Sequence, residues 1–189
     1  MLRSSRLVRQ VFRKVPSNRV HRLFYPQVPA VVSASHDDEV GALLATSIIP
    51  VSLEPSMVGV ALGKQHRTRR LVEASGCFSV CWLSYEKLER FQLLAEHSEA
   101  RDKLRQVGLS YRWGEYVRAP VLEDAVAWVE CRLEWSREVG DHFFYAARVE
   151  TAYAVEDFDE YWRFRQYKPI LYIGSAKQEL PRFLKLSVE

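Results

Sequence analysis

The chain has 189 residues, of which 48% are hydrophobic, and a formal net charge of +3. A chain of this length can bury one substantial core but is short for two domains. Its longest apolar runs, residues 28–34 and 57–62, fall far short of the about 20 residues that a membrane-spanning helix needs. These features predict a single domain with no membrane partner.

Positive charge is concentrated at the N-terminus. Residues 1–36 hold seven Lys or Arg and no acid, whereas the remainder holds 20 basic and 24 acidic residues and therefore sums to −4. The body is thus not a basic nucleic-acid surface, and only the arm could be one. We predict a basic N-terminal extension over residues 1–22 and a single domain over residues 23–189. A solvated or docked extension, a transit peptide and a nucleic-acid tether stay open for the arm, and the first is favoured because the arm runs directly into the first predicted strand.

The cysteines and histidines indicate neither a disulfide framework nor a metal site. The chain has three cysteines, an odd number, which suits a reducing compartment, and we expect a cytoplasmic location. On a strand, Cys77 and Cys81 would lie about 13 Å apart and could not bond to each other. The five histidines and three cysteines show no metal-ligand spacing, so no metal is predicted.

Strands outnumber helices in the predicted order of elements. In chain order we predict strands over 28–35 and 57–62, a helix over 68–75, a strand over 77–83, helices over 85–95 and from 98, strands over 128–135 and 143–154, a helix over 157–165 and a strand over 170–173. Gly76 closes the first helix at its C-cap position. The helices do not alternate regularly with the strands, which favours an antiparallel barrel with peripheral helices over a parallel doubly wound sheet.

Two of these strands are predicted to form a hairpin. Residues 128–135 alternate apolar with polar side chains, as a strand with one solvated face does. Gly140 and Asp141 then mark a turn into the strand over 143–154. We therefore expect these two strands to pair antiparallel.

Residues 45–70 place a hydroxyl-bearing turn, a buried strand and a basic helix start in succession. Thr46 and Ser47 offer hydroxyl and N–H groups, and Ile48 offers a flat apolar contact. At the helix start, the dipole adds to the side chains of Lys64, Arg67 and Thr68. Such a set can hold the phosphate and ring of a mononucleotide cofactor. The alternative is an ordinary Ser-Pro-rich loop followed by a solvated basic helix.

Short motifs along most of the chain occur in an order that resembles one known family. They are Tyr25-Pro26, residues 30–34, Ala45-Thr46-Ser47, Pro50-Val51-Ser52, Glu54-Pro55, residues 58–60, His66-Arg67-Thr68, residues 75–80, Glu130-Cys131, Gly140-Asp141-His142 and residues 168–174. In this order and spacing the sequence resembles the flavin reductase-like family, particularly its flavoredoxin branch. The resemblance covers about residues 14–175.

The resemblance implies a mainly β fold, an antiparallel, Greek-key-like split β-barrel with peripheral α-helices that binds FMN in preference to FAD. It implies a homodimer with the flavin near the subunit interface. It also implies transfer of reducing equivalents from NADH, NADPH or another donor through the flavin to an acceptor. The candidate cofactor-binding residues are Ala45, Thr46, Ser47, Ile48, Ser52, Lys64, Arg67 and Thr68. His142 is the candidate for aligning the donor, with a structural hydrogen-bonding role as the alternative.

Two positions depart from the family pattern. Relatives commonly carry Asn before the threonine segment and again in the strand over 77–83, where this chain has Leu44 and Cys81. Two other functions stay open: a flavin-binding electron carrier without reductase activity, and a nucleic-acid or partner-binding module that uses the N-terminal arm. An aromatic cluster over 158–167 could cap a flavin pocket, although such a stripe is more often core or dimer contact.

Overall fold

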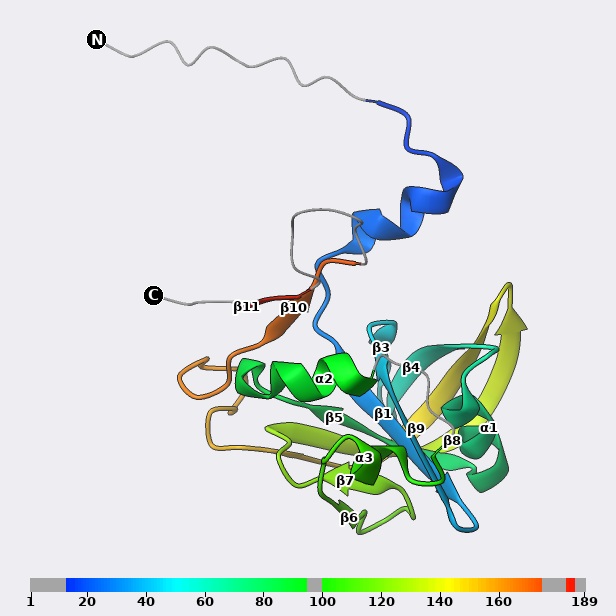
Figure 1. Cartoon of the computed structure of the whole chain (residues 1–189), viewed down its shortest axis with the longest axis vertical. Helices are drawn as coiled ribbons and strands as arrows, with labels where there is room; N and C mark the ends of the chain where they lie inside the picture. The colour runs from blue at the N-terminus through cyan, green and yellow to red at the C-terminus, as the bar shows by residue number, and fades with distance from the viewer. Residues whose placement is uncertain (1–12, 95–99, 175–182, 186–189) are drawn as a thin grey trace.

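An antiparallel sheet of seven strands dominates the computed structural model, which describes residues 13–94, 100–174 and 183–185 (Figure 1). The strands run in the order β2-β1-β5-β8-β9-β4-β3, and every neighbouring pair is antiparallel. Their bounds are β1 (Ala30–His36), β2 (Glu39–Ala45), β3 (Ile48–Leu53), β4 (Ser56–Gly63), β5 (Cys77–Trp82), β8 (Ala127–Val139) and β9 (His142–Ala154). Two small sheets pair β6 (Tyr111–Trp113) with β7 (Pro120–Leu122) and β10 (Ile170–Tyr172) with β11 (Phe183–Lys185). The predicted mainly β, antiparallel fold is confirmed, and so is the hairpin, as β8 and β9.

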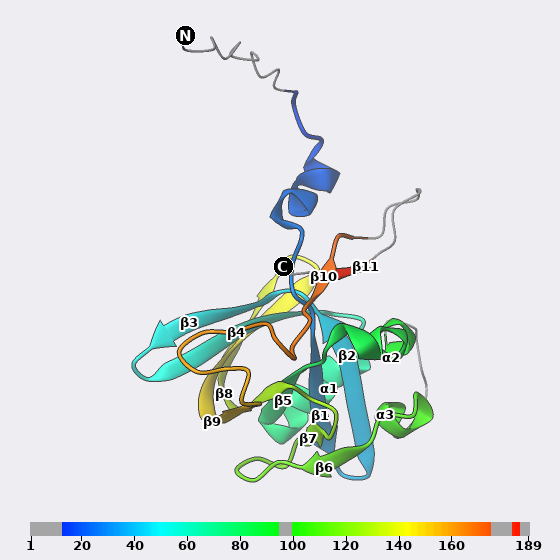
Figure 2. The same ribbon diagram turned by 90° about the vertical axis from the view of Figure 1, so that its left-hand side faces the viewer.

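The sheet curls until its two edges meet. β2 and β3 lie at opposite edges of the sheet, yet only Thr46 and Ser47 separate them in the chain. β2 therefore also contacts β4, the neighbour of β3, but does not pair with it, so hydrogen bonds do not close the described strands into a complete barrel. We call this unpaired meeting of β2 with β4 the seam. Figure 2 shows the hairpin of β3 and β4 reaching out to one side of the body.

Helix α1 (Arg67–Ser75) packs against β1, β2 and β5. Its buried side chains Leu71 and Val72 join the core enclosed by the curled sheet, together with residues such as Val32, Phe78 and Tyr145. The helix ends as predicted, because Gly76 adopts a left-handed conformation with φ of +67° and donates its N–H to the Val72 carbonyl.

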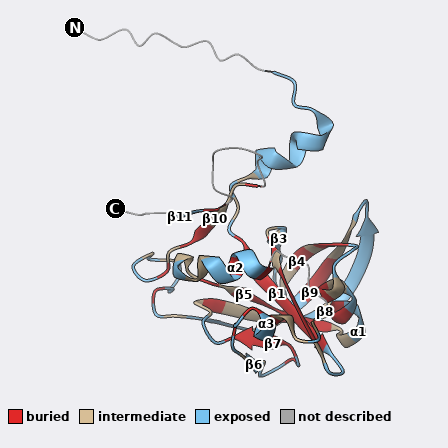
Figure 3. Ribbon diagram, viewed as in Figure 1, coloured by how far each residue is buried: buried red, intermediate tan, exposed pale blue. Residues whose placement is uncertain are grey.

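A second apolar layer covers the outer face of β1 and its neighbours. It includes Val31 of β1, Phe91 and Leu94 of α2 (Leu88–Leu94), and Leu104 of α3 (Lys103–Gln106). Both faces of β1 are therefore buried, so that every residue of the strand from Ala30 to Ser35 is buried (Figure 3). The predicted helix over 85–95 is present as the short 3-10 helix η2 (Tyr85–Lys87) followed by α2, and residue 95 lies outside the described residues. The helix expected from residue 98 begins only at Lys103, after its N-cap Asp102, and residues 98 and 99 are not described.

The strands β2 and β3 were not among the predicted elements. Pro50 and Ser52 gave this part of the sequence the composition of a turn, whereas β3 is a strand with a bulge between these two residues. Because β3 lies at the edge of the sheet, the missing N–H of Pro50 costs little. The hydroxyl-bearing turn is therefore only the two residues Thr46 and Ser47.

The predicted helix over 157–165 is wrong. Asp157 is buried, and its carboxylate accepts N–H bonds from Arg165, Gln166 and Tyr167 at 2.9–3.2 Å. These bonds fold the segment into a loop, in which Phe164 has a positive φ of 55°. Burial alone would raise the pKa of the Asp157 carboxyl, but the three N–H groups outweigh it and hold the pKa below its ordinary value.

We expect Asp157→Asn to lower the thermal midpoint near neutral pH, because an amide cannot accept all three bonds. Since the pKa of Asp157 is lower in the folded than in the unfolded state, its stabilisation is present above the unfolded value of about 4 and is lost as the pH falls through the folded value. The difference in midpoint between wild type and variant should therefore be constant above about pH 5 and shrink below about pH 4. Thermal melts across this range measure it, and a difference that grows in acid would contradict the assignment.

The N-terminal 3-10 helix η1 (Ser17–Phe24) lies away from the body and has no buried residue (Figure 1). Its exposed apolar side chains include Leu23 and Phe24. No helix in the described ranges is long and apolar enough to cross a bilayer. The boundary between an extension over 1–22 and a domain over 23–189 remains our proposal.

Candidate functional site

The turn of Thr46 and Ser47 lies beside the C-terminal half of β4. The Ser47 carbonyl accepts the N–H of Ala61 at 3.0 Å, and Ile48 pairs with Val60. Thr46 is half-buried and Ser47 exposed, and within the described ranges neither hydroxyl has a hydrogen-bond partner. The turn therefore offers two free hydroxyls at one end of the seam.

Lys64 and His142 lie together at the end of β4. Gly63 pairs with His142, and the Lys64 N–H donates to the Asp141 carbonyl at 3.0 Å. His142 Nδ1 lies 2.6 Å from Asp141 Oδ1, and the Lys64 ammonium lies 2.5 Å from Glu138 Oε1. The bond to His142 holds the pKa of the Asp141 carboxyl below its ordinary value.

Lys64 and His142 lie about 10 Å from the turn of Thr46 and Ser47. Lys64 follows Ala61, the partner of Ser47, by three residues, which is about 10 Å along a strand. The structure thus brings Thr46, Ser47, Lys64 and His142 to one region of the molecule. Of the remaining candidates from the turn segment, Ala45 is buried at the end of β2, next to Thr46. Ser52 is half-buried on β3 but pairs with Met57 near the tip of the hairpin, about 16 Å along the strand from Ser47.

Arg67 and Thr68 lie further along the seam, at the start of α1. Thr68 is buried against Gly41, since a Cβ at Gly41 would lie 3.0 Å from Thr68 Oγ1. Gly41 precedes Thr46 by five residues, about 16 Å along β2. The Arg67 guanidinium donates to Glu39 at 2.7 Å and also to the Ala100 carbonyl, so its side chain is directed toward the start of β2 and away from the turn.

The first turn of α1 can still bind an anion through its backbone. The first N–H groups of a helix have no intrahelical partner, and the N-cap residue His66 provides no side-chain cap here. The N–H groups of Arg67 and Thr68 are therefore open at the positive end of the helix dipole. The residues predicted to bind phosphate therefore fall into two groups. Thr46, Ser47 and Lys64 offer side chains, whereas Arg67 and Thr68 offer backbone N–H groups at the start of α1.

A network that the sequence did not reveal anchors α1 to β9. Glu73 accepts from Arg69 at 2.7 Å and from the hydroxyl of the core residue Tyr145, also at 2.7 Å. Arg69 in addition donates to the Lys64 carbonyl at 3.3 Å and lies 4.7 Å from the centre of the Phe143 ring. Burial, and then Glu73, raise the pKa of Tyr145. In the sequence, the only signal for this network is the i,i+4 spacing of Arg69 and Glu73, which is typical of ion pairs on a helix.

The cysteines and the aromatic cluster contribute packing. All three cysteines are buried and free, and burial raises the pKa of Cys81 to about 11, so its thiol is unreactive at neutral pH. The aromatic residues over 158–167 pack on one another, with Trp162 and Tyr167 centred 4.4 Å apart. No group of three or more His, Cys, Asp or Glu positioned to hold a metal occurs in the described ranges.

The family described as "Flavin reductase like domain" matches residues 21–180. The chain belongs to this family. The match covers the seven-stranded sheet, α1 and all the candidate residues. The flavin reductase-like resemblance is therefore confirmed over the part of the chain that carries the candidate residues.

Relatives of this flavin reductase-like protein include proteins with named activities. It is 31% identical over 172 residues to an uncharacterized protein of Aeropyrum pernix, covering 89% of this chain and 65% of that protein. It is 30% identical over 134 residues to the NADH-dependent FMN reductase AsuE2 of Streptomyces nodosus subsp. asukaensis, covering 69% of this chain and 70% of that protein. The solved structure of the NADH:FAD oxidoreductase SgcE6 from Streptomyces globisporus is similar with a TM-score of 0.76 and 25% identity, covering 95% of this chain and all of that one.

Proposed function

We propose that this protein is a flavin reductase-type oxidoreductase that passes reducing equivalents from a nicotinamide nucleotide through FMN to an acceptor. The observation that carries the proposal is the seam, whose two ends hold unpartnered polar groups. These are the free hydroxyls of Thr46 and Ser47 at one end and the uncapped N–H groups of α1 at the other. A mononucleotide with a ring and a phosphate needs donors at two separated points.

The residues at the seam have distinct proposed roles. The N–H groups of Arg67 and Thr68 and the ammonium of Lys64 bind the phosphate, while Thr46 and Ser47 bind polar atoms of the ribityl chain and ring. Ile48, half-buried on β3, provides apolar contact for the ring. When bound, the flavin accepts a hydride and delivers its electrons onward. His142, oriented by Asp141, lies at the same corner as Lys64 and would align the nicotinamide ring.

NADH is the donor we propose first, because the named relatives are NADH-dependent or NADH-linked. FMN is the proposed flavin, with FAD as the competing ligand, since one relative is named for each. Three buried, free cysteines suit a reducing compartment, and we propose the cytoplasm.

A homodimer would cover an exposed apolar surface near the site. β3 is the free edge of the sheet, and Leu53 on it is 90% exposed. Other exposed apolar residues lie on β3 and β8, namely Ile49, Val51, Trp135 and Val139. An exposed apolar edge strand is a surface that proteins normally cover, and a second copy of the chain supplies a matching one.

Replacing the turn hydroxyls should weaken flavin binding without unfolding the protein. We expect Thr46→Val and Ser47→Ala each to raise the dissociation constant for FMN about fivefold, the loss of about 1 kcal/mol per hydrogen bond. Lys64→Gln should cost more, about tenfold, because its contact with the phosphate is charge-assisted. Fluorescence titration of FMN measures these constants, and NADH oxidation in the presence of FMN measures turnover.

Ser110→Ala, at an exposed serine in the loop before β6, is the matched control and should leave both quantities unchanged. FMN affinity that is equal in all four variants and wild type would remove the flavin from the seam. FMN binding without NADH oxidation would instead favour an electron carrier.

A further inference from the structure

A cavity of about 490 Å³ lies on the flank of α1 away from β9. It is lined by Glu39 at the start of β2, Arg101 in the segment before α3, and one face of α1, namely Arg67, Arg70, Leu71 and Ala74. Among the described residues, three arginines and a single glutamate thus surround one space. Nothing in the proposed binding of FMN uses Arg70, Arg101 or Glu39.

Among the described residues that line this cavity, positive charges outnumber negative ones. Glu39 is engaged by Arg67, with distances of 2.7 Å to Nη2 and 3.1 Å to Nε. Arg70 and Arg101 make no side-chain ion pair or hydrogen bond within the described ranges. The hydrogen bond from Arg67 lowers the pKa of Glu39, and the charges of Arg101 and Arg70 lower it further, so all three guanidinium groups act on the same space. Two positive charges are therefore available to an anion.

The position of the cavity suggests which anion. Arg67 belongs both to the cavity wall and to the first turn of α1, whose N–H groups are the proposed donors to the FMN phosphate. Leu71 and Ala74 give the cavity an apolar wall beside the arginines. Guanidinium groups bind phosphate bidentately and stack on planar rings, which suits an adenosine phosphate that continues from the first phosphate group.

We propose that this cavity binds a phosphate group on the adenosine half of a dinucleotide, one that FMN and NADH lack, with Arg70 and Arg101 as its phosphate-binding residues. The proposal rests on the proposed flavin site. Two dinucleotides carry the required chemistry: FAD, whose adenylate extends from the flavin phosphate, and NADPH, which bears an additional phosphate on its adenosine. A site of this kind would let the protein distinguish FAD from FMN, or NADPH from NADH.

The test compares ligands that differ only in the proposed group. We expect the double variant Arg70→Gln/Arg101→Gln to lose at least about tenfold in affinity for FAD, or to gain at least about tenfold in KM for NADPH, as charge-assisted contacts to phosphate are lost. The affinity for FMN and the KM for NADH should stay within about twofold of wild type. A change in the ratio of FAD to FMN affinity identifies FAD as the source, and a change in the ratio of NADPH to NADH identifies NADPH.

Arg165→Gln, which removes the same charge from an exposed position on the aromatic loop, is the control and should change neither ratio. The single variants Arg70→Gln and Arg101→Gln should each show part of the loss. Ratios that equal those of wild type, in a variant that still binds FMN and oxidises NADH, would overturn the cavity proposal alone. A wild-type protein that binds neither flavin would overturn it together with the proposed function.

Discussion

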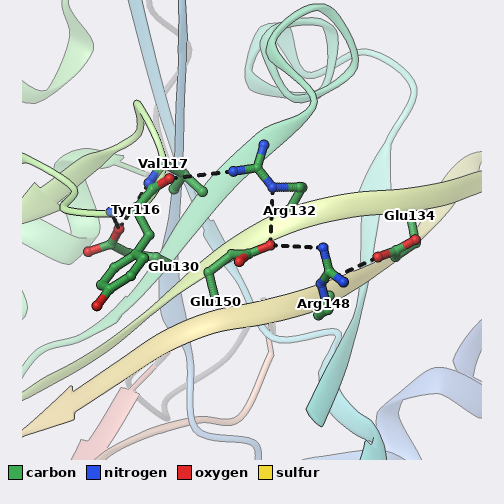
Figure 4. Close-up of polar contacts among 7 residues, drawn as sticks. All are labelled: Tyr116, Val117, Glu130, Arg132, Glu134, Arg148 and Glu150. Atoms are coloured by element: carbon green, nitrogen blue, oxygen red, sulfur yellow. Dashed lines mark hydrogen bonds and ion pairs between the residues drawn. The ribbon is translucent and has the colours of Figure 1, made fainter. Parts of the chain in front are cut away.

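Glu130→Ala is expected to lower the free energy of unfolding by about 3 kcal/mol, because three backbone N–H groups lose a charged acceptor. Glu130 lies on β8 and is fully buried. Its Oε1 accepts from the N–H of Glu115 at 3.0 Å. Its Oε2 accepts from the N–H groups of Tyr116 at 2.8 Å and Val117 at 3.2 Å (Figure 4). One carboxylate thus fixes the whole connection between β6 and β7 on the sheet.

The same strand provides a matched control. Four residues along β8, Glu134 pairs with Arg148 at 3.6 Å in an exposed row of charges that continues through Glu150 to Arg132 (Figure 4). Glu134→Gln should change stability by no more than about 0.5 kcal/mol. The loss of stability in Glu130→Gln should fall between those of Glu130→Ala and Glu134→Gln, since an amide keeps one acceptor oxygen. Equal effects of Glu130→Ala and Glu134→Gln in urea unfolding would contradict the assigned role.

Gly41→Val is expected to destabilise the fold by about 3 kcal/mol and to weaken FMN binding at least about tenfold, because it separates α1 from β2. A Cβ at Gly41 would lie 2.7 Å from Leu71 Cδ1, 3.0 Å from Thr68 Oγ1 and 3.1 Å from Thr68 Cα. The Leu71 side chain can rotate, but the backbone of Thr68 can move only with the helix. The start of α1 would then shift relative to the turn of Thr46 and Ser47.

Graded substitution separates the two effects. Gly41→Ala should show the same two changes at smaller size, and flavin affinity measured well below the unfolding temperature keeps loss of binding distinct from loss of fold. Val72→Ala, in the same helix but in the core beneath it, should lower stability with a smaller effect on FMN affinity. If Gly41→Val binds FMN as tightly as wild type, the start of α1 takes no part in the site.

The sequence predicted elements whose signal is local and missed those decided by distant residues. The hairpin of β8 and β9 follows from alternation and a Gly-Asp turn, and the end of α1 follows from Gly76. β3 was missed because Pro50 indicates a turn unless the strand is known to lie at a sheet edge. The helix over 157–165 failed because its helical spacing is overridden by Asp157, whose carboxylate binds backbone eight to ten residues further along.

The same distinction applies to the candidate site. The turn of Thr46 and Ser47 was recognised from its residue types and its order among the family motifs. The orientation of Arg67 was not, because its partner Glu39 lies 28 residues away in sequence and carries no motif of its own. The arginine cavity also joins residues from three separate segments, which only the packing of α1 on β2 brings together.

In the proposed function, the seam binds a flavin that a nicotinamide nucleotide reduces. The most direct measurement is to add FMN to the purified full chain without oxygen, remove unbound flavin, and follow the visible absorption of the bound flavin after NADH is added. We expect a coloured protein, and we expect NADH to bleach the absorption of the bound FMN much faster than that of free FMN. A protein that stays colourless with both FMN and FAD, and that does not accelerate the reduction of either flavin by NADH, would contradict the proposed function.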